Sequence, residues 1–402
     1  MGELKNRDWF RDTGLMFSVA FLYRAALCLY FLFIRGLPEQ WTNEVSAIAH
    51  SLVLHHSFAG VYRGYAGPTA WIAPVYPFIV AAVFQCFGID SQKSAAVLLL
   101  LNAIFSALAA VLIYKLGREF LTEKVGLVAA WAWIVSPLVA VMTFLFWDTS
   151  LSALMLCLAL LVLLRSRTTL RWAAAGALWG LSALVSPTLL APLPAILGVK
   201  LWRSEMALKV GLAFCLTMAC ILLPWSIRNR RELHANFPVR SNLWAEIYFG
   251  NVSFDLHPAH SSGFYQQVGE TRFVQQLRTD AIQYIAIHRR EFLSMTLRRT
   301  VHFWLMPWYL LPLTASLALG CLLGGVFLLR NLGLSAIPFV AVPVFYPIIY
   351  SMTHIEVRYR HPIEPIVYLM AAYAVCEISK QRRAWCRRRA EYPHSPSPSN
   401  PL

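Results

Sequence analysis

Long apolar segments separated by short polar loops make up most of this chain. The first apolar segment covers about residues 14–36, and further ones follow at 71–88, 94–116, 124–145, 149–164, 172–186, 187–201, 207–225, 309–329, 332–352 and 363–379. A helix that crosses a bilayer needs about 20 mostly apolar residues, and several of these segments approach that length. The pattern therefore predicts an all-α polytopic membrane protein.

The segment at 71–88 decides how the later helices are oriented. It is short and is interrupted by Pro74 and Pro77, which is typical of a re-entrant or interfacial helix in the first outer loop. If it does not cross the membrane, the basic loops near 115–124, 165–171, 200–209 and Arg330 all lie on the side of the N-terminus. Because positively charged loops stay in the cytoplasm, we predict about ten spans with both termini cytoplasmic.

Composition agrees with a membrane protein. Of the 402 residues, 58% are hydrophobic and only 14% are charged, whereas about a quarter of the residues of a soluble domain are charged. The net charge of +15 does not indicate nucleic-acid binding, because the basic residues fall mostly in the short loops that orient the spans. The eight cysteines lie mostly inside apolar segments, so no disulfide framework is expected.

The polar segments divide the chain into four regions. Residues 1–225 form an N-terminal transmembrane module, whose first outer loop, 37–93, carries candidate catalytic chemistry. Residues 226–305 form an external segment, in which apolar residues recur every three or four positions from Phe264 to Phe292 and predict an amphipathic helix. Residues 306–380 form the C-terminal transmembrane helices, and 381–402 form a cytoplasmic disordered tail.

Two groups of arginines lie on the outer side, against the usual charge bias. Arg228 directly follows the seventh span, and Arg358 and Arg360 lie in the short loop before the last span. Long loops are translocated whatever their charge, which accounts for the outer position of Arg228. It does not account for Arg358 and Arg360, because their loop is short. We interpret these cations as ligands for an anion. Arg24, inside the first span, either bonds carbonyl groups within the bundle or contacts a substrate.

Two carboxylates accompany these arginines on the outer side. Glu44 lies in the first outer loop, and Asp148 precedes the fourth span. A carboxylate can remove a proton from an acceptor hydroxyl, and arginines can hold a phosphate and stabilise its charge as it leaves. A phosphate at membrane depth implies a lipid phosphate, and the sequence contains no glycine-rich or Asp-x-Asp motif for a soluble nucleotide donor.

The order of these motifs resembles that of the GT-C membrane glycosyltransferases, which include protein O-mannosyltransferases and lipid A aminoarabinose transferases. The resemblance covers most of residues 14–365 and includes Ala49-His50-Ser51-Leu52, Pro74-Val75-Tyr76-Pro77, Pro224-Trp225-Ser226-Ile227-Arg228-Asn229 and Arg358-Tyr359-Arg360-His361-Pro362. The family's first loop usually reads Asp-Glu-x-x-Tyr-x-x-x-Ala-x-x-Leu. Here Trp41 and Thr42 stand at the acidic positions, and Glu44 is the nearest carboxylate.

The resemblance implies an enzyme that moves a sugar from a polyprenyl-phosphate donor to a glycan, lipid or protein acceptor. It implies Glu44 and Asp148 as catalytic residues, and it implies substrate binding by the following side chains: Arg228, Arg358, Arg360, His361 and Tyr76. The expected location is a bacterial inner membrane, with the site facing the periplasm or exterior. No cofactor is assigned, and the sequence leaves a requirement for a divalent metal open.

Two other classes of protein stay open. A transporter or flippase for lipid-linked saccharides would use a similar basic cavity, but it needs access from both faces, whereas these polar residues cluster on one. A non-catalytic protein of envelope assembly would bind without transferring a sugar. For Glu44, the alternative to catalysis is a surface role in which it caps its helix or pairs with Arg63.

Overall fold

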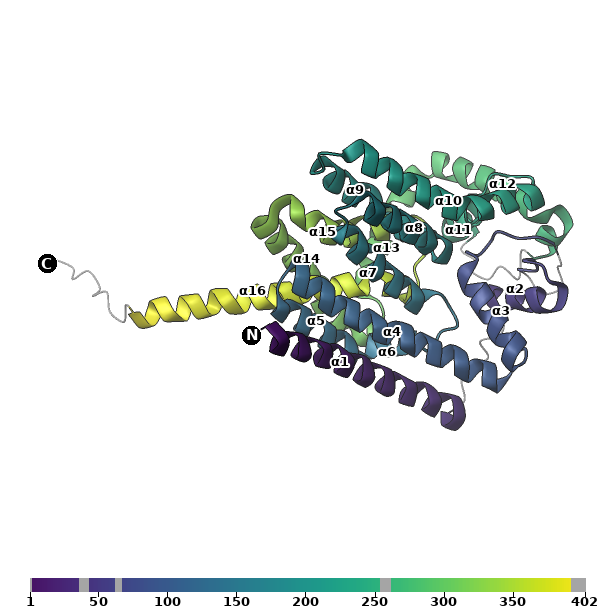
Figure 1. Cartoon of the computed structure of the whole chain (residues 1–402). Helices are drawn as coiled ribbons and strands as arrows, with labels where there is room; N and C mark the ends of the chain where they lie inside the picture. Colours follow the sequence, from purple (N-terminus) through teal and green to yellow (C-terminus); the bar gives the residue numbers. More distant parts are fainter. Residues whose placement is uncertain (1, 36–42, 62–66, 254–261, 392–402) are drawn as a thin grey trace.

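The computed structural model describes residues 2–35, 43–61, 67–253 and 262–391. This part of the chain is helical, with short turns and no strand besides an isolated bridge between Ala59 and Pro68. The start of α1 (Gly2–Tyr30) and the end of α16 (Glu364–Glu391) lie at one end of the bundle, and α2 (Glu44–His55) and α3 (Val75–Phe87) lie at the other (Figure 1). The predicted all-α membrane fold is confirmed.

The described chain contains five stretches that are long and apolar enough to cross a membrane. They are Thr13–Ile34, α4 (Gln92–Phe120), α10 (Ala207–Leu233), the stretch Trp308–Met352 with α14 (Leu311–Leu332) and α15 (Ile337–Met352), and Val357–Arg387. Shorter helices complete the bundle: α5 (Glu123–Val135), α6 (Pro137–Met142), α7 (Thr149–Arg165), α8 (Thr169–Val185) and α9 (Leu193–Trp202). The number of ten spans stays a prediction.

The outer loop and the external segment contain shorter elements. The helix α3 has 13 residues, so at 1.5 Å per residue it spans only about 20 Å, which suits the predicted interfacial helix. The external segment contains α11 (Leu243–Tyr248), α12 (Ser262–Ile287) and α13 (Arg289–Leu305). Single turns complete the described elements: Phe31–Arg35, Pro187–Leu190, Phe249–Ser253, Trp308–Leu310, Gly333–Ala336, Val357–Tyr359 and His361–Ile363.

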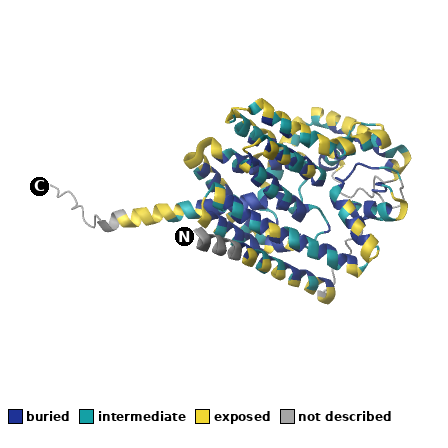
Figure 2. Cartoon of the chain, in the orientation of Figure 1, coloured by how far each residue is buried: buried dark blue, intermediate teal, exposed yellow. Residues whose placement is uncertain are grey.

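The outside of the bundle is apolar, as expected for helices that face lipid. Exposed residues follow the outer surfaces of the helices (Figure 2). On α10, the side chains of Leu208, Leu212 and Leu216 are 78%, 52% and 63% exposed. Contiguous apolar surface of this kind is rare on soluble monomers, and hydrocarbon chains of a bilayer would cover it.

Glycines allow pairs of helices to approach closely. A Cβ atom at Gly324 of α14 would overlap the backbone carbonyl of Met370 in α16, and one at Gly176 of α8 would overlap that of Phe214 in α10. Without a hydrophobic driving force between helices in lipid, such close backbone packing is a principal source of association.

Arg24 is completely buried inside the bundle. Its guanidinium donates hydrogen bonds to the carbonyl oxygens of Ala20 and Trp133, at 3.3 and 2.9 Å. It is not among the residues that line the cavity described below. This placement agrees with the structural alternative for Arg24, because its charge is spread over helix carbonyls of α1 and α5.

The structure differs in three places from the regions that the sequence suggested. The helix α10 continues to Leu233, so it crosses the expected boundary at 225. The amphipathic helix is present as α12, but Gly269 interrupts it with a φ of 78°. The prediction of disorder from 381 is wrong for 381–391, because α16 continues to Glu391, and the remaining tail, 392–402, lies outside the described residues.

The close approach at Gly324 gives a first prediction. Replacing Gly324 by Leu should destabilise the packing of α14 on α16 by about 1–3 kcal/mol, since the added side chain meets backbone. Thermal unfolding of the purified protein in detergent measures this effect. Gly198→Leu is the control, because a Cβ at Gly198 meets no atom within 4 Å. Equal melting temperatures for the two variants would contradict the packing argument.

The orientation of the bundle gives a second prediction. Reporter fusions after Gly88 and inside the segment 226–305 should read external, whereas fusions after Leu121 and Arg167 should read cytoplasmic. Fusions to alkaline phosphatase report an external position, and fusions to a fluorescent protein report a cytoplasmic one. A cytoplasmic signal from 226–305 would contradict the arrangement, because that segment and the first outer loop line the same cavity.

Candidate functional site

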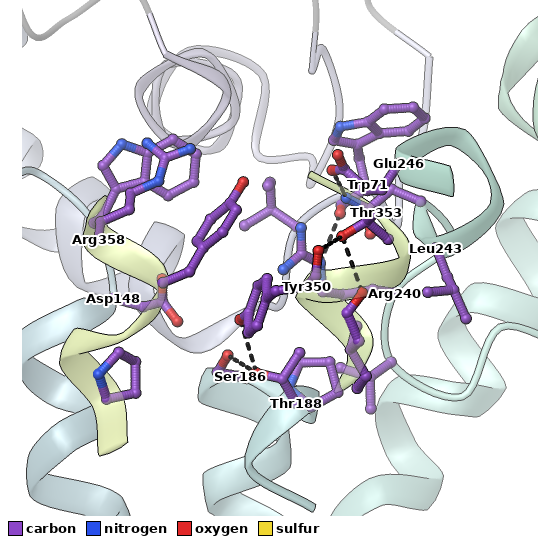
Figure 3. Close-up of a pocket in the computed structure, with 18 of the residues that line it drawn as sticks. Trp71, Asp148, Ser186, Thr188, Arg240, Leu243, Glu246, Tyr350, Thr353 and Arg358 are labelled. Atoms are coloured by element: carbon purple, nitrogen blue, oxygen red, sulfur yellow. Dashed lines mark hydrogen bonds between the residues drawn. The ribbon is translucent and has the colours of Figure 1, made fainter. Parts of the chain in front are cut away.

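A cavity of about 450 Å³ lies where the first outer loop, the external segment and the outer ends of several helices meet. Its size is in the range of sites for small molecules. Its charged lining consists of Glu44, Asp148, Arg240, Glu246, Glu356 and Arg358. Figure 3 shows Asp148 and Arg358 on one side of it, Arg240 and Glu246 on the other, and Tyr350 between them. Residues distant in sequence thus share one polar chamber.

Glu44 is the first residue of α2 and lines this cavity. The helix is capped by its neighbour Asn43, whose side-chain oxygen accepts a hydrogen bond from the backbone N–H of Ser46 at 2.9 Å. Burial raises the pKa of Glu44 above its ordinary value, although the positive charges of Arg358 and Arg240 oppose this shift. The proposed surface partner, Arg63, lies outside the described residues.

Asp148 lines the cavity from the N-terminal end of α7. Its Oδ2 atom accepts a hydrogen bond from Ser152 Oγ at 3.0 Å. Burial raises the pKa of Asp148, and the positive charge of Arg240 acts in the opposite direction. The structure thus brings both carboxylates that the sequence singled out into one cavity, each with an increased affinity for a proton.

Arg358 is held at the cavity by an aromatic ring and a carboxylate. Its guanidinium lies 4.1 Å from the centre of the Trp147 ring. Its Nε and one terminal nitrogen reach the two carboxylate oxygens of Glu356, at 2.9 and 3.0 Å. Burial alone would raise the pKa of Glu356, but His354 and Arg358 outweigh it and hold that pKa below its ordinary value. Glu356 therefore stays ionised and balances Arg358.

Glu246 and His354 connect the external segment to the bundle. The Nδ1 atom of His354 lies 3.3 Å from Glu246 Oε2, and its Nε2 atom lies 2.7 Å from the hydroxyl of Tyr359. Both residues line the cavity, and the sequence analysis assigned neither. A signal for Glu246 was present, because it is the single carboxylate in the apolar stretch Leu-Trp-Ala-Glu-Ile-Tyr.

Arg240 is the cation that the sequence analysis missed. It lines the cavity, and its Nε atom donates to the carbonyl oxygen of Trp71 at 3.0 Å. Its two terminal nitrogens donate to no other residue in the described part of the chain. The external segment contains many arginines, and the sequence offers no motif that distinguishes this one. Its guanidinium is nevertheless the one best placed to receive an anion.

Arg228 takes a different position from the one expected. It does not line the cavity. Its two terminal nitrogens donate to the carbonyl oxygens of Thr69 and Phe58, both at 2.6 Å, and the guanidinium lies 5.5 and 5.1 Å from the ring centres of Phe58 and Trp225. The side chain therefore binds the backbone of the first outer loop.

The segment Thr69–Trp71 is bound from several sides. Glu270, which is 2% exposed, accepts hydrogen bonds from the Thr69 hydroxyl and from the backbone N–H of Ala70, the latter at 2.8 Å. The backbone N–H of Ser241 donates to the carbonyl oxygen of Ala70 at 2.9 Å, and Arg240 Nε donates to the carbonyl oxygen of Trp71. These contacts satisfy buried backbone groups and fix the Trp71 side chain at the cavity.

Three other side chains expected at the substrate lie in the core. Arg360 and His361 are buried and bind the two oxygens of Glu364, at 3.1 and 3.0 Å. The Tyr76 hydroxyl donates to Asn102 Oδ1 at 3.4 Å. None of the three expected residues is among those that line the cavity, so their placement does not support a substrate contact. The Tyr76 bond instead joins α3 to α4, and Arg360 also donates to the carbonyl oxygen of Trp304 in α13 at 2.6 Å, so both side chains hold helices together.

The described part of the chain contains no group of three or more His, Cys, Asp or Glu side chains arranged to hold a metal ion. Two of the carboxylates at the cavity already have defined partners, because Glu356 binds Arg358 and Glu246 accepts from Asn242 at 2.6 Å. The structure therefore assigns no residue of the cavity to a metal.

Comparisons with known proteins agree with this architecture. Residues 71–227 match the family model of dolichyl-phosphate-mannose-protein mannosyltransferases. No curated protein sequence matches the chain. A structure of the archaeal oligosaccharyltransferase AglB from Archaeoglobus fulgidus, in complex with an inhibitory peptide and a dolichol-phosphate, superposes with a TM-score of 0.58 at 14% identity. The match covers 95% of this chain and 52% of that one.

Two further structures extend the comparison. The Archaeoglobus enzyme tethered to an acceptor peptide gives a TM-score of 0.56 at 16% identity, over 94% of this chain and 51% of that one. ArnT from Cupriavidus metallidurans, bound to undecaprenyl phosphate, gives a TM-score of 0.42 at 13% identity. That match covers 96% of this chain and 81% of the ArnT chain. The chain thus spans about half the length of the oligosaccharyltransferase chains that it matches. The matched family model and the shared fold confirm that the chain resembles the GT-C membrane glycosyltransferases, and it has their fold.

Proposed function

We propose that this protein is a glycosyltransferase that moves a sugar from a polyprenyl-phosphate donor to an acceptor at the external face of the membrane. The observation that carries the proposal is the cavity that Glu44 and Asp148 share with Arg240 and Arg358. The matched family acts, by its name, with dolichyl-phosphate mannose, and the similar AglB structure was solved with a dolichol-phosphate. A lipid phosphate suits the two arginines that line this cavity.

The lining of the cavity suits both parts of such a donor. The free amino groups of Arg240 can form a charge-assisted fork with phosphate oxygens, and Arg358 adds a second positive charge. The side chains of Leu190, Leu222 and Ile349 also line the cavity, and they offer apolar contact for the first isoprene units. The phosphate and the start of the lipid can therefore bind without burying an unpaired charge.

The transfer step needs a base and a stabilised leaving group. An acceptor hydroxyl attacks the anomeric carbon of the sugar, and the bond between that carbon and the phosphate oxygen breaks. The proton of the hydroxyl passes to a carboxylate, and the bonding electrons leave with the polyprenyl phosphate. Arg240 stabilises the additional negative charge on that phosphate, and Arg358 adds positive charge from across the cavity.

We assign the base to Glu44 and a supporting role to Asp148. Burial raises the pKa of Glu44, so its carboxylate binds a proton more tightly than that of an ordinary glutamate and is a stronger general base. Asp148 is bound by Ser152 and is less free to move, so it can orient the acceptor or the sugar. In this proposal the protein lies in a bacterial inner membrane with the cavity toward the periplasm or exterior. The acceptor is a glycan, lipid or protein.

The assignment predicts the effect of replacing each carboxylate. Glu44→Gln should reduce turnover by about a hundred- to ten-thousand-fold, since an amide cannot accept the proton, and Asp148→Asn should be equal or milder. Transfer of labelled sugar from a polyprenyl phosphate to membrane acceptors measures turnover. Glu205→Gln, an exposed carboxylate outside this cavity, is the control. Turnover of Glu44→Gln within about threefold of wild type, far outside the acid–base range, would reject the role.

The same assignment predicts the pH dependence of turnover. Glu44 acts only when ionised, so the rate should fall as the pH drops through its pKa. Because burial raises the pKa of Glu44, this fall should begin at a higher pH than the value of about 4.3 for an ordinary glutamate. Measuring the rate across acidic pH in wild type tests this, and an acidic midpoint at or below the ordinary value would contradict it.

The donor site predicts that Arg240 controls lipid-phosphate affinity. Removing a hydrogen bond to a charged group costs about 1.5–3 kcal/mol, so Arg240→Ala should weaken the binding of polyprenyl phosphate by about ten- to a hundredfold. Arg240→Lys should restore the affinity only in part, because lysine cannot form the fork. Isothermal titration or fluorescent-lipid displacement measures the dissociation constant.

Two arginines provide comparisons for this prediction. Arg230→Ala should leave lipid affinity unchanged, because Arg230 is exposed and does not line the cavity. Arg228→Ala should lower thermal stability together with affinity, because it releases the Thr69–Trp71 segment. Wild-type affinity in Arg240→Ala would show that the phosphate binds elsewhere.

A further inference from the structure

A row of four hydroxyl groups runs along the floor of the cavity. Ser186 Oγ lies 3.1 Å from Thr188 Oγ1, which lies 3.2 Å from the Tyr350 hydroxyl, which in turn lies 3.2 Å from the Tyr346 hydroxyl. Ser186, Thr188 and Tyr350 line the cavity, whereas Tyr346 is fully buried and does not. Figure 3 shows Ser186 and Thr188 below Tyr350, joined to it through hydrogen bonds.

The central hydroxyl of this row is held in a fixed position. The ring of Tyr350 stacks on those of Tyr359 and Phe303, with centroid distances of 4.5 and 6.1 Å and interplanar angles of 23° and 20°. Thr188 belongs to the turn Pro187–Leu190, and the backbone of Ser186 is bound to Ser182 at 2.8 Å. A ligand would therefore meet hydroxyls that are already in place, with little loss of side-chain entropy on binding.

The row retains hydrogen-bonding capacity toward the cavity. Each hydroxyl has one donor and two acceptor lone pairs, so three contacts among four groups leave one donor and several lone pairs unused. Either atom of each contact can be the donor, so the row can reverse its direction. It can thus offer a donor or an acceptor to the cavity. That dual character matches the hydroxyl groups of a sugar better than it matches a phosphate.

We infer that Ser186, Thr188 and Tyr350 form a neutral subsite that binds hydroxyl groups of the sugar on the donor. This inference rests on the proposed function, since it places the sugar next to the phosphate that Arg240 binds. Tyr350 lies between Asp148 and Arg240 in the cavity, as the sugar must lie between the carboxylates and the leaving phosphate (Figure 3). The arginines then select the lipid phosphate, and the hydroxyl row selects the sugar.

The test compares a short-chain polyprenyl phosphate with the same lipid carrying mannose, glucose or galactose. For each protein, the ratio of the two dissociation constants isolates the contribution of the sugar. With the sugar that wild type binds most tightly, Tyr350→Phe and Thr188→Val should each reduce this contribution by about three- to tenfold, as expected for one or two lost hydrogen bonds. Their affinity for the bare lipid should stay unchanged, which also shows that the variants are folded.

Tyr346→Phe is the matched control, because it removes a hydroxyl from the same row outside the cavity. It should keep the wild-type ratio. An unchanged ratio in Tyr350→Phe, an equal loss in Tyr346→Phe, or a parallel loss of affinity for both lipids would overturn the subsite. If wild type binds the bare lipid but none of the sugar-bearing lipids more tightly, the subsite is overturned and the phosphate site stands. If it binds neither, the proposed function fails as well.

Discussion

The candidate site depends on how firmly the Thr69–Trp71 segment is attached to the rest of the protein. Its backbone is bound by Arg228 of α10, by Glu270 of α12, and by Arg240 and Ser241 of the external segment. These partners come from regions far apart in sequence. Because buried backbone groups must be paired, these contacts together fix the Thr69–Trp71 segment against the bundle. Trp71 itself lines the cavity, so the same contacts define part of its wall.

The same contacts explain the distribution of charge on the outer face. Arg228 binds loop backbone, Arg360 binds a buried carboxylate, and Arg358 is balanced by Glu356. Arg240 keeps its terminal nitrogens available at the cavity. Arg228 and Arg360 therefore stabilise the fold, whereas Arg240 and Arg358 line the cavity beside the carboxylates. Burial raises the pKa values of Glu44 and Asp148 in the same cavity, which suits the proton transfer proposed above.

Hydropathy and charge in the sequence were sufficient to predict the helical membrane fold, the short helix after Pro74, and the two carboxylates Glu44 and Asp148 on one face. They could not predict which way a side chain points. Within the motif around Arg358, the Arg358 side chain lines the cavity whereas that of Arg360 lies in the core, and hydropathy treats the two arginines alike. Arg240 was missed because its position depends on a hydrogen bond to the backbone of Trp71, which lies 169 residues earlier in the chain.

The central claim is that the outer cavity holds a lipid phosphate next to two carboxylates. A cryo-electron microscopy structure of the full chain in nanodiscs, with a bound polyprenyl phosphate, tests it most directly. We expect the phosphate inside the cavity that Glu44 and Asp148 line, within hydrogen-bonding distance of the Arg240 guanidinium, about 3 Å. A phosphate bound outside the cavity, or at the cytoplasmic ends of the helices, would contradict the account.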